Sequence, residues 1–420
     1  MNNTQESSAS AWMFRNFRLY TYGAVLLPFA SQIQTLIIGW QVYQIKHDPL
    51  FLGFIGLIEA LPALSLALVS GYIVDKSNPL IVFKNVVRLA LFSAILLTTL
   101  SSPWVLVSNA QKLPWLYVAA FLAGVGRGFR MPANTALVPR LVPRHALHIS
   151  SAWNTSGFAI ASSLGPALGG FMYAWKGTSA PYDLNVVVLV IALIFISRIQ
   201  IESHELKSQE KENEKVFSAF HRLTAGMRYV YSHQLLLSAL TLDMFAVLFG
   251  GAVALLPIFA GEVLHVGPLG LGILRSAPSV GAIFGGLLLI RFPVRRHSGK
   301  ILLATVAGFG LCMIGFGYSH SFLFSLILLS LGGAFDSVSM VIRGAIVQLS
   351  APPEMRGRVG AVNSIFIGVS NQLGEFESGV LAKLMGTAPS VVFGGIVTLI
   401  VVSITAVIAP KLRKMELSKL

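Results

Sequence analysis

The stretch Glu202-Ser-His-Glu-Leu-Lys-Ser-Gln-Glu-Lys-Glu-Asn-Glu-Lys215 is the one long polar run in the interior of an otherwise apolar chain of 420 residues. Charged residues make up 11% of the sequence and hydrophobic residues 55%, whereas soluble proteins carry about a quarter charged residues. The composition therefore excludes a soluble fold. Because the polar run divides the apolar sequence into two parts of similar length, it indicates a linker between two membrane-embedded halves.

Six apolar segments on each side of the polar run are candidates for crossing a bilayer, whose core of about 30 Å needs roughly 20 apolar residues per helix. The segments lie near Phe17–Tyr43, Leu50–Val74, Ile81–Leu100, Leu113–Val138, Ser150–Ala174, Val186–Ile201, Leu235–Ala260, Leu269–Phe292, Ile301–Gly317, Phe322–Leu349, Val359–Leu384 and Val391–Ile408. The sixth and ninth are short. The pattern predicts an all-α integral membrane protein with twelve transmembrane helices.

The predicted organisation has five parts, which follow from the spans and the linker. They are an N-terminal tail (1–16), a first six-helix bundle (17–201), a linker (202–234), a second six-helix bundle (235–408) and a C-terminal tail (409–420). The tails and the linker are expected to be cytoplasmic.

The basic residues are distributed unevenly among the connections. Of the 31 Lys and Arg residues, 23 lie in the tails and the even-numbered connections or in the span ends that adjoin them, 4 in or next to the odd-numbered connections and 4 deeper inside spans. An excess of Lys and Arg marks the cytoplasmic side of a membrane protein. We therefore predict a multi-pass protein of a bacterial cytoplasmic (inner) membrane with both termini in the cytoplasm. The net charge of +14 is then a topology signal, and no nucleic-acid partner is expected.

The two halves are related by matches at an offset of 209 residues. The matches include Pro143 with Pro352, Asn154 with Asn363, Gly165 with Gly374, Gly170 with Gly379 and Gly177 with Gly386. A duplicated six-span unit in parallel orientation is typical of secondary transporters with two pseudo-symmetric halves. Such an arrangement predicts a substrate site between the halves, near the middle of the membrane.

Two motifs of the first half resemble those of the major facilitator superfamily. Gly71-Tyr-Ile-Val-Asp75-Lys76 resembles the first part of that superfamily's signature between spans 2 and 3, in which a glycine permits a tight turn and an Asp–basic pair locks neighbouring helices. The second part does not match, and an ordinary polar turn is the alternative. In span 5, Ser163-Leu-Gly165-Pro166-Ala-Leu-Gly169-Gly170 is similar to the superfamily's antiporter motif, which implies export. A small-residue packing face is the alternative there.

The second half resembles one branch of this superfamily more specifically. The stretch Ala351-Pro-Pro-Glu-Met-Arg356-Gly-Arg358-Val, followed by Ser370-Asn-Gln-Leu-Gly374-Glu375-Phe-Glu377-Ser-Gly, is similar to the enterobactin-exporter-like branch. The resemblance implies the major facilitator fold and places the chain among siderophore exporters and broader drug-efflux relatives.

Ionisable residues inside spans cost about 2.5–3.5 kcal/mol each to insert and are candidates for function. The resemblance implies that spans 1, 4, 7 and 10 line the cavity, and these spans carry five such residues: Arg127, Arg130, Asp243, Asp336 and Arg343. Asp243 and Asp336 are expected at comparable depth, and Asp336 and Arg343 share a helix face. We hypothesise that Asp243 or Asp336 carries the coupling proton and that Arg343 or Arg130 modulates it. Structural ion pairing is the alternative.

Three further polar residues are candidates for lining the substrate cavity. They are Gln34, which is deep in span 1, Glu59 in span 2 and Glu377 in span 11. Glu375 occupies the place of Pro166 under the offset of 209, and a role in packing span 11 is favoured for it over contact with substrate.

These observations together predict a secondary transporter, not an enzyme. No phosphate-binding Gly-x4-Gly-Lys-Ser/Thr loop and no His or Cys pair with metal-ligand spacing is present in the sequence. We expect no cofactor and no metal, and a proton gradient as the driving force. The predicted activity is proton-coupled export of a small amphipathic molecule, a siderophore or a drug. An importer or metal-ion exporter of the same fold is one alternative, and a membrane sensor or enzyme without transport activity is another. The expected partners are a small-molecule substrate, protons and the lipid bilayer, and a monomer is expected with the oligomeric state open.

Overall fold

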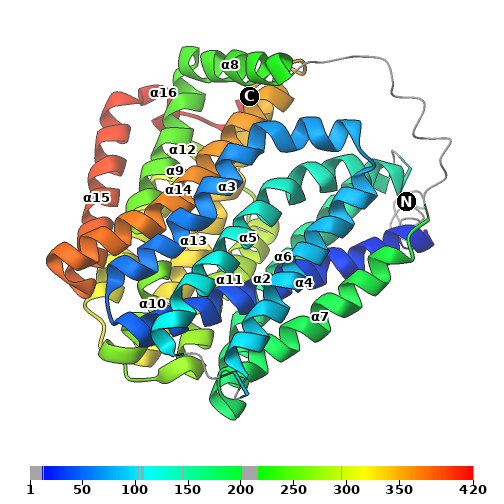
Figure 1. Cartoon of the computed structure of the whole chain (residues 1–420). Helices are drawn as coiled ribbons and strands as arrows, with labels where there is room; N and C mark the ends of the chain where they lie inside the picture. The colour runs from blue at the N-terminus through cyan, green and yellow to red at the C-terminus, as the bar shows by residue number, and fades with distance from the viewer. Residues whose placement is uncertain are drawn as a thin grey trace. The chain divides into compact units, whose positions relative to one another are not determined.

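The computed structural model describes residues 12, 14–102, 104–105, 108–143, 146–200, 216–294 and 296–419, which form helices joined by short turns (Figure 1). Within these ranges, nine helices are long and apolar enough to cross a membrane by length and composition. Three more helices of 29 or 30 residues, α5, α6 and α14, fall on the remaining predicted spans. The prediction of an all-α membrane protein with twelve spans is therefore confirmed.

Contacts between Cα atoms divide the chain into two units. The first unit is Met1–Gln41 with Leu61–Ala219, and the second is Val42–Ala60 with Phe220–Leu420. The segment Val42–Ala60, which contains the turn between the first two helices, thus groups with the second unit. The predicted domain boundaries stay a prediction, since most of the N-terminal tail and the linker stretch 202–215 lie outside the described residues.

Two helix starts in the first unit are explained by side-chain caps. The Asn78 side chain accepts a hydrogen bond from the Leu80 amide, and Pro79 follows at the first helical position. Ser108 and Gln111 form a reciprocal capping box. α4 packs against α5 and α7. The helices that contribute to this unit are α2 (Arg15–Lys46), α3 (Pro49–Lys76), α4 (Pro79–Ser101), α5 (Asn109–Leu137), α6 (Leu147–Lys176) and α7 (Ser179–Ser197).

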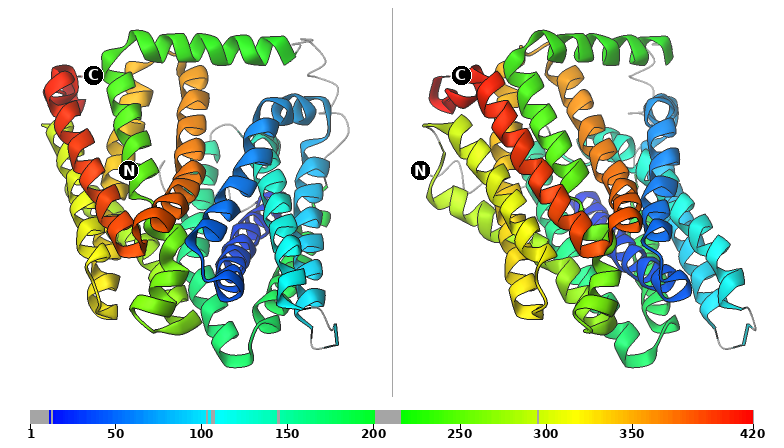
Figure 2. Two further views of the ribbon diagram at one scale, coloured as in Figure 1. Left: turned by 60° about the vertical axis from the view of Figure 1, so that its left-hand side comes forward. Right: turned by 90° about the vertical axis from the view of Figure 1, so that its left-hand side faces the viewer.

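The second unit is built on the packing of α11 against α13, of α12 against α13 and α15, and of α9 against α14 and α15. The α8 helix lies at one end of this unit, beside the ends of α9 and α14 (Figure 2), and the Tyr229 hydroxyl anchors it by donating to the Ser350 carbonyl at 3.2 Å. The helices are α8 (Val216–Ser232), α9 (Gln234–Gly250), α10 (Leu256–Ile258), α11 (Gly267–Arg291), α12 (Ser298–Gly317), α13 (Phe322–Ser350), α14 (Arg356–Met385), α15 (Thr387–Ile408) and α16 (Pro410–Arg413).

The seventh span is interrupted, which corrects the prediction of one continuous helix over Leu235–Ala260. After α9 ends at Gly250, a 3-10 turn, the short α10 and a π-helical turn (Phe259–Val263) complete the span. Gly251 has a non-helical backbone, with φ −76° and ψ 60°. The Ser378 hydroxyl donates to the Gly251 carbonyl at 3.0 Å. A neighbouring side chain thereby satisfies a backbone oxygen that the broken helix leaves without its usual partner.

Gly71 does not form a turn, contrary to what the loop signature implied. It lies inside α3, which continues to Lys76, and a Cβ built on it would meet nothing within 4 Å. The chain reverses only at Ser77 and Asn78, because Asn78 caps the next helix there. The sixth helix, α7, also begins seven residues before the predicted Val186.

The repeat detected at an offset of 209 has structural counterparts in the two units. Gly177 ends α6 with φ +78°, and Gly386 ends α14 with φ +95°, a backbone region that favours glycine. A Cβ on Gly165 would lie 3.1 Å from the Phe29 carbonyl oxygen of α2, and one on Gly374 would lie 2.8 Å from the Leu248 carbonyl oxygen of α9. Each unit therefore uses the same paired glycines for a helix end and for close helix packing.

Candidate functional site

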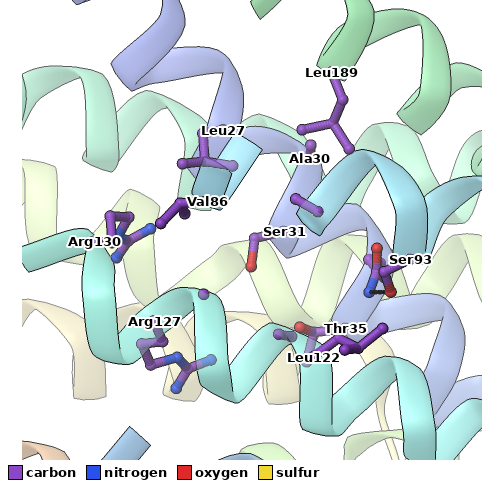
Figure 3. A pocket seen from close by; sticks show the side chains of 14 residues that line it. Leu27, Ala30, Ser31, Thr35, Val86, Ser93, Leu122, Arg127, Arg130 and Leu189 are labelled. Carbon is purple, nitrogen blue, oxygen red and sulfur yellow. Dashed lines mark hydrogen bonds between the residues drawn. The ribbon is translucent and has the colours of Figure 1, made fainter. Parts of the chain in front are cut away.

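The first unit contains an open cavity between α2, α4, α5 and α7 (Figure 3). Most of its lining is apolar or small. The lining residues are Leu27, Ala30, Ser31, Gln34, Thr35, Val86, Ala90, Ser93, Leu122, Ala123, Gly126, Arg127, Arg130 and Leu189. The cavity therefore combines apolar surface with a few polar and charged side chains, as small-molecule sites do.

A hydrogen-bond network joins three helices at one side of this cavity. The Gln34 amide donates to the Ser93 hydroxyl at 3.0 Å, and the Asn185 amide donates to the Gln34 carbonyl oxygen at 3.3 Å. Gln34 is buried and belongs to the lining of this cavity, which lies within the first unit. Because the nitrogen and the oxygen of the Gln34 amide are both hydrogen-bonded, the network links α2, α4 and α7.

Two arginines on one turn of α5, Arg127 and Arg130, give the cavity its positive charge (Figure 3). Arg130 interacts electrostatically with the Tyr20 hydroxyl. This hydroxyl accepts a hydrogen bond from the Asn154 amide at 3.4 Å. No Asp or Glu is among the described residues that line this cavity. Its electrostatic character is therefore basic.

A second, smaller cavity lies in the second unit and has acidic side chains. It is lined by Asp243, Ala246, Val247, Val306, Phe309, Asp336 and Ser339. Asp243 of α9 forms an ion pair with Arg343 of α13, and both residues are buried, at 7% and 4% exposed. Asp336 lines the same cavity, and the described part of the chain shows no ion pair to it. The structure thus brings Asp243, Asp336 and Arg343 together and distinguishes the two acids.

Two predicted cavity acids, Glu59 and Glu377, and Glu375, for which a packing role was favoured, lie elsewhere in the helix bundle. A Cβ on Gly56 of α3 would lie 2.6 Å from the Glu375 Cβ of α14, so Glu375 packs closely against α3. Glu377 is half-buried, and one of its carboxylate oxygens lies 3.5 Å from the Ser378 hydroxyl oxygen. Glu59 is buried. None of these three lines either of the two cavities.

The residues of the conformational motifs occupy helix ends and helix crossings. Asp75 and Lys76 lie in the last turn of α3, where the Lys76 ammonium sits 4.6 Å from the centre of the Tyr72 ring. Arg356 begins α14 and donates to the Ala351 carbonyl at 3.2 Å. Arg358 lies in the same turn, and its backbone oxygen would be 2.8 Å from a Cβ on Gly226 of α8. These contacts join α8, α13 and α14 at one end of the second unit.

In the antiporter-like motif, Pro166, Gly169 and Gly170 lie inside α6 together with Gly165. A Cβ on Gly165 would lie only 2.9 Å from the Gln32 Cβ of α2, whereas one on Gly169 would make ordinary contacts of 3.4 Å. Gly165 is therefore the position of this motif at which the absence of a side chain permits close packing.

Sequence reasoning missed an ion pair between two connections. Lys383, near the end of α14, donates to Asp48, in the turn between α2 and α3, at 2.5 Å. Burial alone would raise the pKa of the Asp48 carboxyl, but the Lys383 ammonium and the Leu50 amide outweigh burial and lower this pKa. The opposite charges at positions 48 and 383 were a signal, but Lys383 was interpreted only as a topology marker.

Asn185 and Ser93 were also missed, since single polar residues in apolar runs are common. Among the residues that the structure describes, no group of three or more His, Cys, Asp or Glu is placed to hold a metal ion.

Comparison with known families shows to which family the chain belongs. A family described as transmembrane secretion effector matches residues 8–420. The chain belongs to this family. Its members are transporters of the major facilitator superfamily and not enzymes, which confirms the expected resemblance and the expected absence of enzymatic activity.

Relatives of this secretion-effector chain include efflux proteins. It is similar to macrolide efflux protein A of Streptococcus pyogenes, with 22% identity over 97% of this chain and 98% of the relative. It is also similar to the enterobactin exporter EntS of Citrobacter koseri, with 24% identity over 71% and 70%. Among solved structures, a D-xylose-proton symporter matches with a TM-score of 0.75 at 12% identity, covering 96% of this chain and 99% of that one. The structural likeness shows the fold, and the secretion-effector chain is thus a multi-pass membrane transporter.

Proposed function

We propose that this chain is a proton-coupled exporter of a small amphipathic molecule, a siderophore or a drug. It acts as a monomer in a bacterial inner membrane with both termini in the cytoplasm. The excess of basic residues in the tails and even-numbered connections supports this orientation. The names of the two relatives, a macrolide efflux protein and an enterobactin exporter, support export and the substrate class.

The observation that carries the proposal is the different pairing of the two acids in the second cavity. Asp243 has its charge balanced by Arg343. Asp336 lines the same cavity without such a partner in the described residues. An unpaired carboxylate held away from water is costly in its charged form. Asp336 therefore takes up the coupling proton when the cavity is closed to the cytoplasm and releases it when the cavity opens there, while Asp243 and Arg343 hold the site.

The test uses the purified full chain in liposomes, with a macrolide and enterobactin as probes. An imposed pH gradient should drive accumulation of at least one probe against its concentration. Asp336→Asn should lose this gradient-driven accumulation but retain downhill equilibration of the same probe, because the carrier still cycles. A pH-sensitive dye inside the liposomes reports the accompanying proton movement.

Glu354→Gln is the matched control, because Glu354 is an exposed acid in the turn before α14 and lines neither cavity. This variant should accumulate the probe as the native chain does. Unchanged gradient-driven accumulation in Asp336→Asn would refute the role of Asp336. Movement of neither probe by the native chain would refute the substrate class.

A further inference from the structure

We infer that the cavity of the first unit binds an anionic group of the substrate, a carboxylate, with Arg130 as its principal partner. The inference rests on the proposed function, since it assigns a chemical class to the molecule that is exported. It concerns binding in the first unit and is independent of the acids in the second unit.

The first step is the charge of the cavity. Arg127 and Arg130 lie three residues apart on α5, so they project from the same face of that helix. The positive charges of the two side chains repel one another. None of the described residues lining the cavity is acidic, so a bound anion meets the Arg130 guanidinium without competition from a carboxylate of the lining.

The second step is the choice of anion. A guanidinium presents N–H donors in a planar fork that matches the two oxygens of a carboxylate. The hydroxyls of Ser31 and Thr35 belong to the same lining and offer further donors. Figure 3 shows the Ser31 side chain directed toward α5, the helix that carries both arginines. The Ser31 hydroxyl thus lies on the side of the cavity that faces the helix of the two arginines.

The third step is the shape of the remaining ligand. Leu27, Val86, Leu122 and Leu189 supply apolar surface to the same cavity. The Gln34 amide is already hydrogen-bonded to Ser93 and Asn185, so it lines the cavity without offering the ligand a strong hydrogen bond. A molecule with an apolar body and one carboxylate complements this lining, in which a few placed polar groups fix the orientation.

The experiment measures equilibrium binding to the full chain in phosphatidylcholine nanodiscs. The probes are matched pairs of aromatic carboxylates and their neutral amides: benzoate, 2-naphthoate and anthracene-9-carboxylate, each with its amide. Nanodiscs without protein correct for uptake into lipid. At least one carboxylate should bind about tenfold tighter than its amide, as expected for a hydrogen bond to a charged group. Arg130→Gln should abolish this preference without changing amide binding, and Arg130→Lys should retain part of it.

Arg198→Gln is the control, because Arg198 is an exposed arginine at the end of α7 outside the cavity lining. It should keep the full preference. Equal affinity for acid and amide in every pair, or a preference that survives in Arg130→Gln, would overturn the inference. A second arm adds phosphatidylglycerol to the nanodiscs. If this lipid displaces the carboxylate from the native chain but does not bind Arg130→Gln, the site holds a lipid headgroup, and the substrate assignment is wrong.

The binding result is separable from the proposed function. A carboxylate preference that depends on Arg130 stands even if no pH gradient drives accumulation in liposomes, which would refute proton-coupled export alone. Conversely, proton-coupled export without a preference for carboxylates would leave the proposed function intact and remove this inference.

Discussion

The cavities of the two units differ in the sign of their charge although the units descend from one repeated pattern. The first cavity has two arginines and no acid among its described lining residues, while the second has two aspartates and no basic residue in its lining. The glycines that end and pack the helices, in contrast, recur in both units at an offset of 209. The scaffold is therefore shared, and the charges of the two cavities have diverged.

This difference suggests that the two cavities have different roles. An acidic cavity suits the transfer of protons, because carboxylates can gain and lose them. A basic cavity with fixed guanidinium charges suits the binding of an anion, because arginine stays protonated. The predictions below test this comparison, beginning with the largest expected effect.

The strongest test removes Arg343, the cation that pairs with Asp243 of the acidic cavity. Arg343→Gln leaves Asp243 buried without its partner, which should cost about 3–5 kcal/mol of stability. Thermal or chemical unfolding of the purified protein measures the loss, and Asp243→Asn combined with Arg343→Gln should recover much of it. Arg130→Gln is the matched variant in the basic cavity and should cost far less, because it leaves no unpaired carboxylate in that lining. Equal losses in the two single variants would contradict the comparison.

The second prediction tests the scaffold that holds the acidic cavity. A Cβ on Gly281 of α11 would meet the Ser330 carbonyl of α13, a backbone atom that cannot rotate away. Gly281→Val should therefore destabilise the protein by about 3 kcal/mol through overpacking. Gly286→Val is the control on the same helix, since a Cβ there would meet nothing within 4 Å. Similar unfolding of both variants would show that the crossing of α11 and α13 tolerates a side chain.

The third prediction concerns the wall of the basic cavity. Gln34→Leu removes the hydrogen bonds to Ser93 and Asn185 and leaves both buried groups without that partner. The expected cost is about 1–2 kcal/mol, measured by unfolding. Adding Asn185→Leu and Ser93→Ala should cost less than the sum of the separate changes, because no polar group is then left behind. Strict additivity would argue against a network.

The smallest expected effect belongs to the pair Asp48–Lys383, which joins the segment Val42–Ala60 to α14 within the second unit. The Lys383 side chain is 53% exposed, so the pair should contribute about 0.2–1 kcal/mol. The pKa of Asp48 is lowered in the folded protein. The pair therefore stabilises the fold fully at pH values above about 3.9, the ordinary pKa of an aspartate, and this stabilisation is lost as the pH falls through the lowered pKa.

A double-mutant cycle of Asp48→Asn and Lys383→Gln at pH 7 and at pH 3 measures this contribution. The coupling energy should be positive at pH 7 and smaller at pH 3. A coupling that does not change with pH, or that grows at pH 3, would contradict the assigned pair.

Much of the architecture could be predicted from the sequence because a bilayer imposes a simple rule on each segment. Roughly 20 apolar residues make a span, and this rule identified the long helices. The repeat between the halves was found from residues matched at an offset of 209, and the resemblance to the major facilitator superfamily singled out Arg127, Arg130, Asp243 and Asp336. The structure places the two arginines in the lining of the first cavity and the two aspartates in the lining of the second.

Tertiary structure alone decided how these residues are paired. Hydropathy does not show which helices pack against one another, so the sequence left both Asp243 and Asp336 as candidates for the coupling proton. Only the packing of α9 on α13 shows that Arg343 pairs with Asp243. The break at Gly251 was missed for the same reason, because the Ser378 hydroxyl that satisfies the carbonyl comes from α14, more than a hundred residues away. Length and polarity determined the spans, whereas contacts between distant helices determined where the unbalanced charges lie.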